Sequence, residues 1–157
     1  MKKTVLALVS ALFLVAACDS SSDDSANANG AGFGTGNGVL GQAADGTNVG
    51  DRVFFVLNSS VLTGEAQATL DRQAAWLKAN SSTSVVVEGH ADERGTREYN
   101  LALGERRATA AKNYLVSTGV AASRLSTVSY GKERPAVTGS DDSAWSQNRR
   151  AVTVIAN

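Results

Sequence analysis

A short loop between two glycines is the feature that most constrains the fold of this chain. It runs from Gly89 to Gly95, after a β-branched strand predicted over Thr83 to Gly89 and before a long helix predicted over Arg97 to Thr118. Thr96 is a typical N-cap residue for that helix, and Gly119 suits its C-terminal cap. Glycines at both ends of the loop permit tight backbone turns. The segment therefore predicts a strand, a sharp polar loop and a helix in direct succession.

The rest of the globular pattern supplies three further strands and a second long helix. Strands are predicted over 52–57, 125–130 and 150–155, a helix over 64–79 capped by Thr63, and a single helical turn over 142–146. The run from Arg52 to Leu57 is apolar almost throughout, which indicates a strand at the centre of the sheet. The order β-α-β-α-β-β predicts an α+β fold, with a mixed four-stranded sheet and two main helices packed on it.

The first residues have the composition of a targeting segment. Lys2 and Lys3 precede an apolar run that ends at Ala17, too short to span a bilayer as a helix, which needs about 20 apolar residues. We therefore predict a signal peptide over residues 1–17. Its end, Leu14-Val15-Ala16-Ala17-Cys18, resembles the lipobox of bacterial lipoproteins, which predicts lipidation of Cys18.

Cys18 is the only cysteine of the chain, so it cannot form an internal disulfide. The alternative to lipidation is an ordinary signal peptide with an unpaired thiol or an intermolecular bridge. Lipidation would anchor the protein without a transmembrane helix, and two or more acyl chains hold a membrane firmly. Bacterial lipoproteins typically have three.

Residues 18–50 are predicted to be a lipidated N-terminus followed by a flexible linker, and residues 51–157 a single domain. The linker is rich in Ser, Asn, Gly, Ala and Asp, and its few large apolar residues show no periodicity. From residue 19 to 50 it has four acidic residues and no basic one, whereas residues 51–157 have 13 basic and 11 acidic residues. Neither part has the basic bias of a nucleic-acid-binding protein, so that class is excluded.

The predicted helix places a cation beside the loop. Asn100 and Arg107 lie together on one flank, with Leu103 a little further round, while Arg106 points to water. The predicted apolar face consists of Leu101, Gly104, Ala108, Ala111 and Leu115. The loop brings the Asp92 carboxylate toward this helix. A carboxylate and a guanidinium together suit a zwitterionic ligand such as an amino acid. The alternative is that Asp92 and Arg107 pair with each other and fix the loop.

Four separated blocks of the sequence closely resemble one known family. The blocks are 87–96 with 98–100, 103–108, 128–137 and 147–152. They resemble the proteins that share the outer-membrane-protein-A-like C-terminal domain, in particular the peptidoglycan-associated lipoproteins. The likeness spans about two thirds of the chain, from Asp51 to Asn157. It implies the architecture given above and a non-catalytic protein that is anchored by lipid in the outer membrane, with its domain in the periplasm.

The resemblance also implies partners and a ligand. Asp92 and Arg107 match the family residues that hold diaminopimelate, the zwitterionic residue of the peptidoglycan stem peptide. The implied partners are peptidoglycan and TolB of the Tol-Pal system, with a role in envelope integrity and cell division. Two alternatives stay open, a wall-modifying enzyme and a lipoprotein of the same domain unconnected to Tol. Asp19 departs from the usual pattern, because in enteric bacteria an aspartate there tends to retain lipoproteins at the inner membrane.

Two further residues complete the candidate site. His90 is the only histidine, and without a second His or a domain cysteine it makes a poor metal site. It also lacks a recognisable nucleophile, so we expect it to shape the loop or contact ligand. Asn58 stands near the position where many members have an aspartate or asparagine, and it lacks the charge. We predict no cofactor and no metal.

Overall fold

The computed structural model describes residues 38–156. The predicted signal peptide, the predicted lipidation site Cys18 and the first part of the predicted linker lie outside the described residues. In chain order the elements are β1 (Val39–Gln42), β2 (Asn48–Gly50), β3 (Arg52–Phe54), α1 (Gly64–Ala79), β4 (Val85–His90), α2 (Arg97–Ser117), the 3-10 helix η1 (Ala122–Arg124), β5 (Leu125–Gly131), α3 (Asp142–Asn148) and β6 (Arg150–Ile155).

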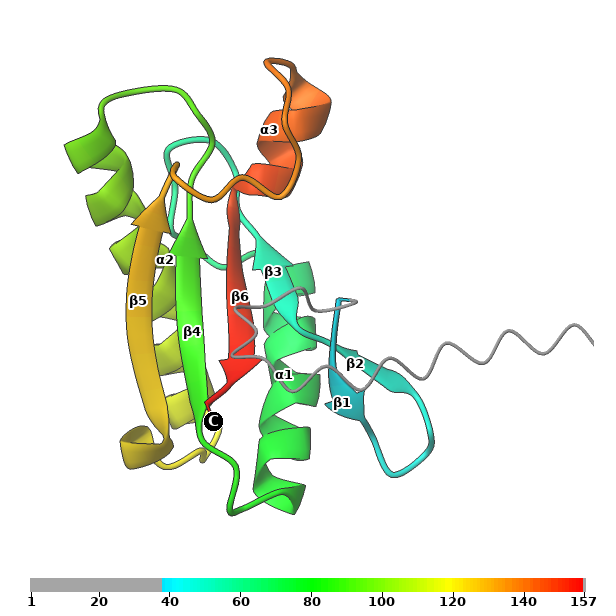
Figure 1. Cartoon of the computed structure of the whole chain (residues 1–157). Coiled ribbons are helices and arrows are strands. Elements are labelled where there is room, and N and C mark those ends of the chain that lie inside the picture. Colours follow the sequence, from blue (N-terminus) through cyan, green and yellow to red (C-terminus); the bar gives the residue numbers. More distant parts are fainter. Residues whose placement is uncertain (1–37, 157) are drawn as a thin grey trace, which may run out of the picture. The chain divides into compact units, whose positions relative to one another are not determined.

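Four strands form one mixed sheet in the order β3-β6-β4-β5 (Figure 1). β4 and β5 run parallel, whereas β6 is antiparallel to its neighbours β3 and β4. The predicted α+β fold with a mixed four-stranded sheet is confirmed. The prediction that the first of these strands is central is wrong, because β6 inserts between β3 and β4. β3 is an edge strand, and its apolar run reflects an exposed Phe54 rather than burial on both faces.

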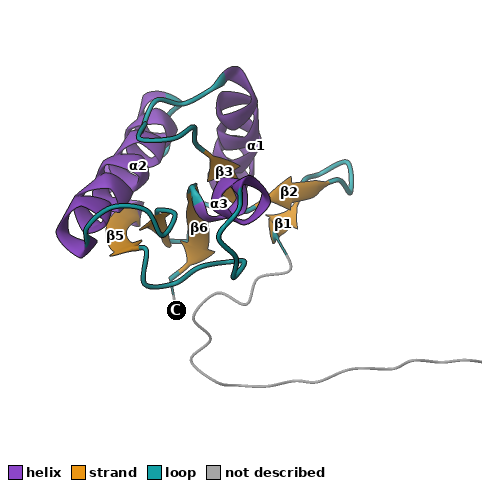
Figure 2. Cartoon of the chain, turned by 90° about the horizontal axis from the view of Figure 1, so that it is seen from above, coloured by secondary structure: helices purple, strands orange, loops and turns teal. Residues whose placement is uncertain are grey.

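Helices α1 and α2 cover one face of the sheet, and α3 lies at one end of it (Figures 1 and 2). α2 packs on β4 and β5, while α1 packs on β3 and on α2. Alternation along each strand directs every second side chain toward these helices. The core between the two layers includes Val53, Phe55, Leu70, Leu77, Val85, Val87, Ala108, Ala111, Leu115 and Leu125.

Both long helices begin at their predicted caps. The Thr63 hydroxyl accepts a hydrogen bond from the third residue of α1, and the Thr96 hydroxyl accepts one from the third residue of α2, each at 3.2 Å. The buried face of α2 contains Leu103 rather than the predicted Leu101, which is 49% exposed. The sheet therefore meets α2 on the flank that includes Asn100, so polar side chains are buried there.

α2 and β4 approach each other closely where two glycines meet. A Cβ atom on Gly89 would collide with the carbonyl of Gly104, and one on Gly104 would collide with the hydroxyl of Ser129. Gly89 therefore serves this helix–strand contact and not the predicted turn. Gly95 does turn the chain, with a left-handed φ of 93°. The close contact brings α2 against the end of β4, where the Asp92 loop begins.

The hairpin of β1 and β2 corrects the predicted linker. Residues 39–50, which the composition assigned to a flexible segment, form an antiparallel pair in which Leu40 and Val49 are buried. Helix α1 provides the covering surface, and Gln73 Nε2 donates to the carbonyl of Gly50 at 2.7 Å. The composition did not indicate this, because two apolar residues gain a buried environment only from a helix later in the chain.

Candidate functional site

Asp92 is the buried carboxylate of the loop between β4 and α2, and it is 5% exposed. Its Oδ1 accepts hydrogen bonds from the backbone N–H of Arg94 at 3.1 Å and from Arg94 Nε at 3.2 Å. Its Oδ2 accepts from Arg94 Nη2 at 2.7 Å and from Arg149 Nη1 at 3.4 Å. Burial acts to raise the pKa of Asp92, but the bonds and charge of Arg94, with a contribution from Arg149, outweigh it and lower the pKa. The carboxylate is therefore ionised at neutral pH.

Arg94 links this loop to α3. Its guanidinium lies over the ring of Trp145, 3.9 Å from the centroid, and Trp145 Nε1 donates to Glu93 Oε1 at 3.1 Å. From α2, Asn100 Nδ2 donates to the Arg94 carbonyl at 2.8 Å. From the segment after β5, Lys132 Nζ donates to two carbonyls of the loop at 2.7 and 3.2 Å. Three separate parts of the fold thus hold the loop that presents the carboxylate.

Arg107 is fully buried and binds backbone rather than an acid. Its Nε donates to the carbonyl of Ser59 at 2.9 Å, Nη1 to that of His90 at 2.8 Å and Nη2 to that of Val56 at 3.2 Å. Burial lowers the pKa of Arg107 to about 10, and the charge of Asp92 partly offsets that effect. The guanidinium joins the loop after β3 to the end of β4.

The two predicted ligand residues do not bond to each other. No hydrogen bond or ion pair joins Asp92 to Arg107 in residues 38–156, so the alternative in which they pair directly is wrong. The partners of Asp92 are two other arginines. A guanidinium has five N–H donors. Arg107 uses three of them in its hydrogen bonds to backbone carbonyls, so two remain. Leu103 is buried on the same side of α2, one turn before Arg107. Arg106 is exposed, as the helical wheel predicted.

His90 is enclosed at the end of β4, 2% exposed, with its ring 5.5 Å from that of Tyr130. Neither ring nitrogen has a hydrogen-bond partner in the described part of the chain, although Glu88 Oε2 lies 3.7 Å from Nε2. Burial lowers the pKa of His90, and the neighbouring carboxylate opposes this shift. Among residues 38–156, no cluster of three or more His, Cys, Asp or Glu side chains is placed to hold a metal ion.

Asn58 occupies a turn whose surface is apolar. It has a left-handed φ of 53°, a conformation that asparagine tolerates better than most residues, and its side chain is exposed. Around it Val56, Leu57 and Val61 are 57%, 50% and 74% exposed. This segment is attached to the core through the Arg107 bonds to Val56 and Ser59. Asn58 thus lies on a largely exposed loop beside the buried guanidinium of Arg107.

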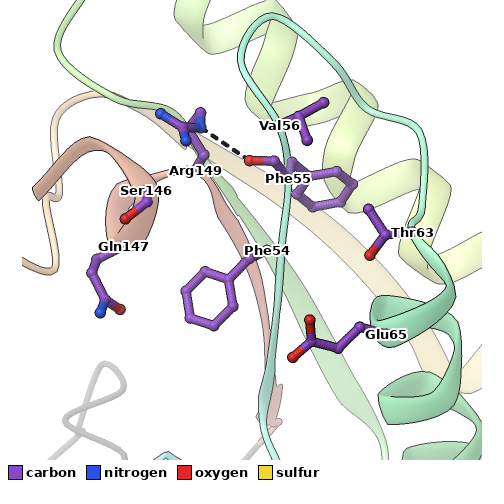
Figure 3. A pocket seen from close by; sticks show the side chains of 8 residues that line it. All are labelled: Phe54, Phe55, Val56, Thr63, Glu65, Ser146, Gln147 and Arg149. Carbon is purple, nitrogen blue, oxygen red and sulfur yellow. Dashed lines mark hydrogen bonds between the residues drawn. The ribbon is translucent and has the colours of Figure 1, made fainter. Parts of the chain in front are cut away.

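A cavity of about 330 Å³ adjoins the Asp92 cluster through Arg149 (Figure 3). Arg149 Nε donates to the carbonyl of Phe55 at 3.0 Å, and its Nη1 is the group that reaches Asp92. In this view the ring of Phe54 stands between the side chains of Gln147 and Glu65. The cavity is open between β3, α1 and α3, so a ligand at Asp92 has polar and aromatic surface beside it.

Three residues of this cluster were not singled out from the sequence. Arg94 stands two positions after Asp92, in the same polar loop, and a cation so close to a carboxylate is itself a signal for a local pair. Arg149 belongs to the block 147–152, which was quoted only for its resemblance. Trp145 lies 53 residues after Asp92 along the chain, and no pattern in the sequence indicates that α3 brings it to the loop.

Comparison with known proteins identifies the family. The sequence profile of the OmpA family matches residues 54–149. The chain belongs to the OmpA family. Within this family it is 54% identical to a peptidoglycan-associated lipoprotein of Rhizobium meliloti, over 96% of this chain and 86% of the relative. A second one, of Mesorhizobium japonicum, is 55% identical over 96% of this chain and 90% of the relative.

A solved OmpA-family structure has the same fold. The crystal structure of the peptidoglycan-associated lipoprotein from Burkholderia pseudomallei is similar with a TM-score of 0.66 and 40% sequence identity. The similarity covers 68% of this chain and 90% of that chain. The sequence resemblance to this family and its implied fold are therefore confirmed.

Proposed function

We propose that this protein is a non-catalytic tether that binds peptidoglycan and links it to the outer membrane. The observation that supports it most is the identity of 54% over 96% of the chain with a protein named as a peptidoglycan-associated lipoprotein. The site is consistent with binding rather than catalysis, because its ionised carboxylate and its guanidinium groups are fixed in hydrogen bonds. None of the described helices is long and apolar enough to cross a membrane.

The proposed ligand is the diaminopimelate of the stem peptide. Asp92 would accept hydrogen bonds from its ammonium, and Arg107 would donate to its carboxylate, each bond contributing roughly 1.5–3 kcal/mol. Because Arg107 is enclosed, a carboxylate reaches its two remaining donors only if the apolar loop around Asn58 shifts. That loop is exposed over most of its length, so a shift would expose little apolar surface that is now covered. Asn100 would hold the Asp92 loop in place through the Arg94 carbonyl.

Leu103 and His90 would contribute shape to the same site. Leu103 is buried on α2, one turn before Arg107. The His90 carbonyl accepts from Arg107, so the backbone of His90 orients the guanidinium while its ring fills the space at the end of β4. Both are therefore proposed as residues that form the binding surface.

The proposed anchor is a lipidated Cys18, outside the described residues. Mass spectrometry of the mature N-terminus should show an acylated cysteine and no Met1 to Ala17. A mature protein that begins elsewhere and lacks acyl chains would contradict this anchor. The proposed location is the outer membrane with the domain in the periplasm, and membrane fractionation with Asp19→Ser tests whether Asp19 diverts the protein to the inner membrane.

The proposed protein partner is TolB, and the proposed physiological role is the Tol-Pal contribution to envelope integrity and division. Co-purification of TolB with the full chain from detergent-solubilised envelopes tests this. Recovery of peptidoglycan without TolB would favour a lipoprotein of the same domain unconnected to Tol.

Binding to the wall is tested by incubating the purified domain with peptidoglycan sacculi. We expect the protein to sediment with the sacculi and to release no soluble wall fragments. Release of fragments would instead support a wall-modifying enzyme. Failure to sediment would contradict the proposed function.

A further inference from the structure

The Asp92 carboxylate has no vacant acceptor site for a ligand. A carboxylate offers about four lone-pair positions. Three are occupied by Arg94, through its backbone N–H, Nε and Nη2, and the fourth by Arg149 Nη1. An ammonium group can therefore bind Asp92 only if it displaces one of these donors. This reasoning rests on the proposed function, because it concerns the same carboxylate.

The Arg94 side chain is the donor best placed to leave. Its side chain is 35% exposed, whereas that of Arg149 is 15% exposed and is tied to the Phe55 carbonyl. The Arg94 carbonyl is held by Asn100, so the backbone of the loop stays in place when the side chain rotates. The guanidinium also lies on the Trp145 ring, which offers it a second contact that does not involve Asp92.

Displacement has an electrostatic consequence that depends on the ligand. Three guanidinium groups, those of Arg94, Arg149 and Arg107, lie around the single buried carboxylate of Asp92. A simple amine that displaces Arg94 adds a further cation and deprives the released guanidinium of its hydrogen-bonded anion, with only the weaker attraction of the Asp142 and Glu93 carboxylates left. A ligand with a carboxylate beside its ammonium gives the released guanidinium a new partner and adds no net charge.

We propose that Arg94 determines specificity, as an internal counter-ion of Asp92 that a bound ammonium displaces and that only a zwitterionic ligand re-pairs. Arg94 thus selects amino-acid centres with both charges over simple amines. Its role differs from that of Arg107, which holds the backbone of two loops.

The test compares two tripeptides by isothermal titration calorimetry with the full chain. One is L-alanyl-D-γ-glutamyl-meso-diaminopimelate, and the other has L-lysine in place of diaminopimelate, so that the side-chain carboxylate is missing. We expect the wild-type protein to prefer the diaminopimelate peptide. Arg94→Gln should bind the lysine peptide more tightly, and the ratio of the two affinities should fall roughly tenfold, the effect of one charge-assisted hydrogen bond.

Arg97→Gln is the matched control. Arg97 is three residues further on and pairs with Glu133 at 3.1 Å, outside the cluster. It should leave both affinities and their ratio unchanged. Arg94→Lys should give an intermediate ratio, because an ammonium keeps the charge and loses the two-pronged geometry.

The outcomes separate this inference from the proposed function. If Arg94→Gln weakens both peptides by the same factor, Arg94 only positions the loop and the inference is wrong. If neither affinity changes, Arg94 is not displaced and the inference is wrong. If the wild-type protein binds neither peptide, the diaminopimelate ligand itself is wrong, and the inference fails with it.

Discussion

Arg107 and Arg94 have their positive charges neutralised in different ways. We call Arg107 with its carbonyl partners the inner side of the site, and the pair of Arg94 with Asp92 the outer side. On the inner side, Arg107 is fully buried and donates to three backbone carbonyls. On the outer side, Arg94 is partly exposed and forms a two-pronged ion pair with Asp92. A buried guanidinium among carbonyls has no way to exchange partners without opening the loops. An ion pair at the surface exchanges partners with a rotation of one side chain.

The difference teaches that closeness to the ligand site and importance for the fold are separate properties. The pKa values of the two arginines shift in opposite directions, although burial acts to lower both. Burial lowers the pKa of Arg107 to about 10, whereas the pKa of Arg94 is raised by its bond to Asp92. The inner arginine should therefore affect stability most, and the outer pair should affect binding most.

The largest expected effect is the loss of stability in Arg107→Ala. Three carbonyls lose their donor, and each buried acceptor left without a partner costs about 1–3 kcal/mol. We expect the free energy of unfolding to fall by at least about 3 kcal/mol, measured by urea denaturation. Arg107→Lys should recover only part of it, because an ammonium lacks the fork that reaches three carbonyls. Equal urea midpoints for wild type and Arg107→Ala would show that the inner arginine does not hold the loops.

The second effect concerns binding. Asp92→Ala should reduce co-sedimentation with peptidoglycan by roughly thirtyfold or more, since a desolvated partner of a charged ligand is removed. Its free energy of unfolding should fall by about 1–3 kcal/mol, because a backbone N–H and Arg149 lose a buried acceptor while Arg94 is partly solvated, which is a smaller loss than that of Arg107→Ala. Glu98→Ala, an exposed acid on the first turn of α2, is the control and should bind as wild type. A large stability loss with normal binding would reverse the contrast between the two sides.

The third effect is a pH dependence at the inner side. The pKa of His90 is lowered by burial, so the unfolded chain binds a proton at a higher pH than the folded chain does. Stability should therefore fall as the pH drops below the ordinary histidine value of about 6.5, by at most about 1.4 kcal/mol per pH unit. Thermal unfolding of wild type and His90→Gln between pH 8 and pH 5 measures this. Parallel curves for the two proteins would assign the dependence to other groups.

The smallest effect is expected for Arg106→Ala. Arg106 lies next to Arg107 in the sequence, but it is exposed, and its guanidinium lies 5.9 Å from the centroid of the Tyr99 ring. Such a contact is worth about 0.5–1 kcal/mol. Peptidoglycan binding should match wild type within error. A loss of binding as large as that expected for Asp92→Ala would mean that α2 presents its outer face to the ligand.

Local signals in the sequence were enough for most of the elements. Thr63 and Thr96 fixed two helix starts, because a hydroxyl that satisfies an unpaired backbone N–H acts within three residues. The β-branched run before Gly89 predicted β4 for the same local reason. The position of β3 within the sheet was predicted wrongly, because β6, the last strand, enters between β3 and β4 and an edge strand can be as apolar as a central one.

The candidate site was likewise predicted only in part from the sequence. The sequence, with its family resemblance, indicated Asp92 and Arg107 as charged groups at one end of the sheet. Tertiary structure alone decided their partners, because those come from separate segments. Arg149 follows α3, and the carbonyls on Arg107 belong to the loop after β3 and to β4. Hydrogen bonds of a guanidinium depend on where other chain segments end in space, and no periodicity or composition in the sequence encodes that position.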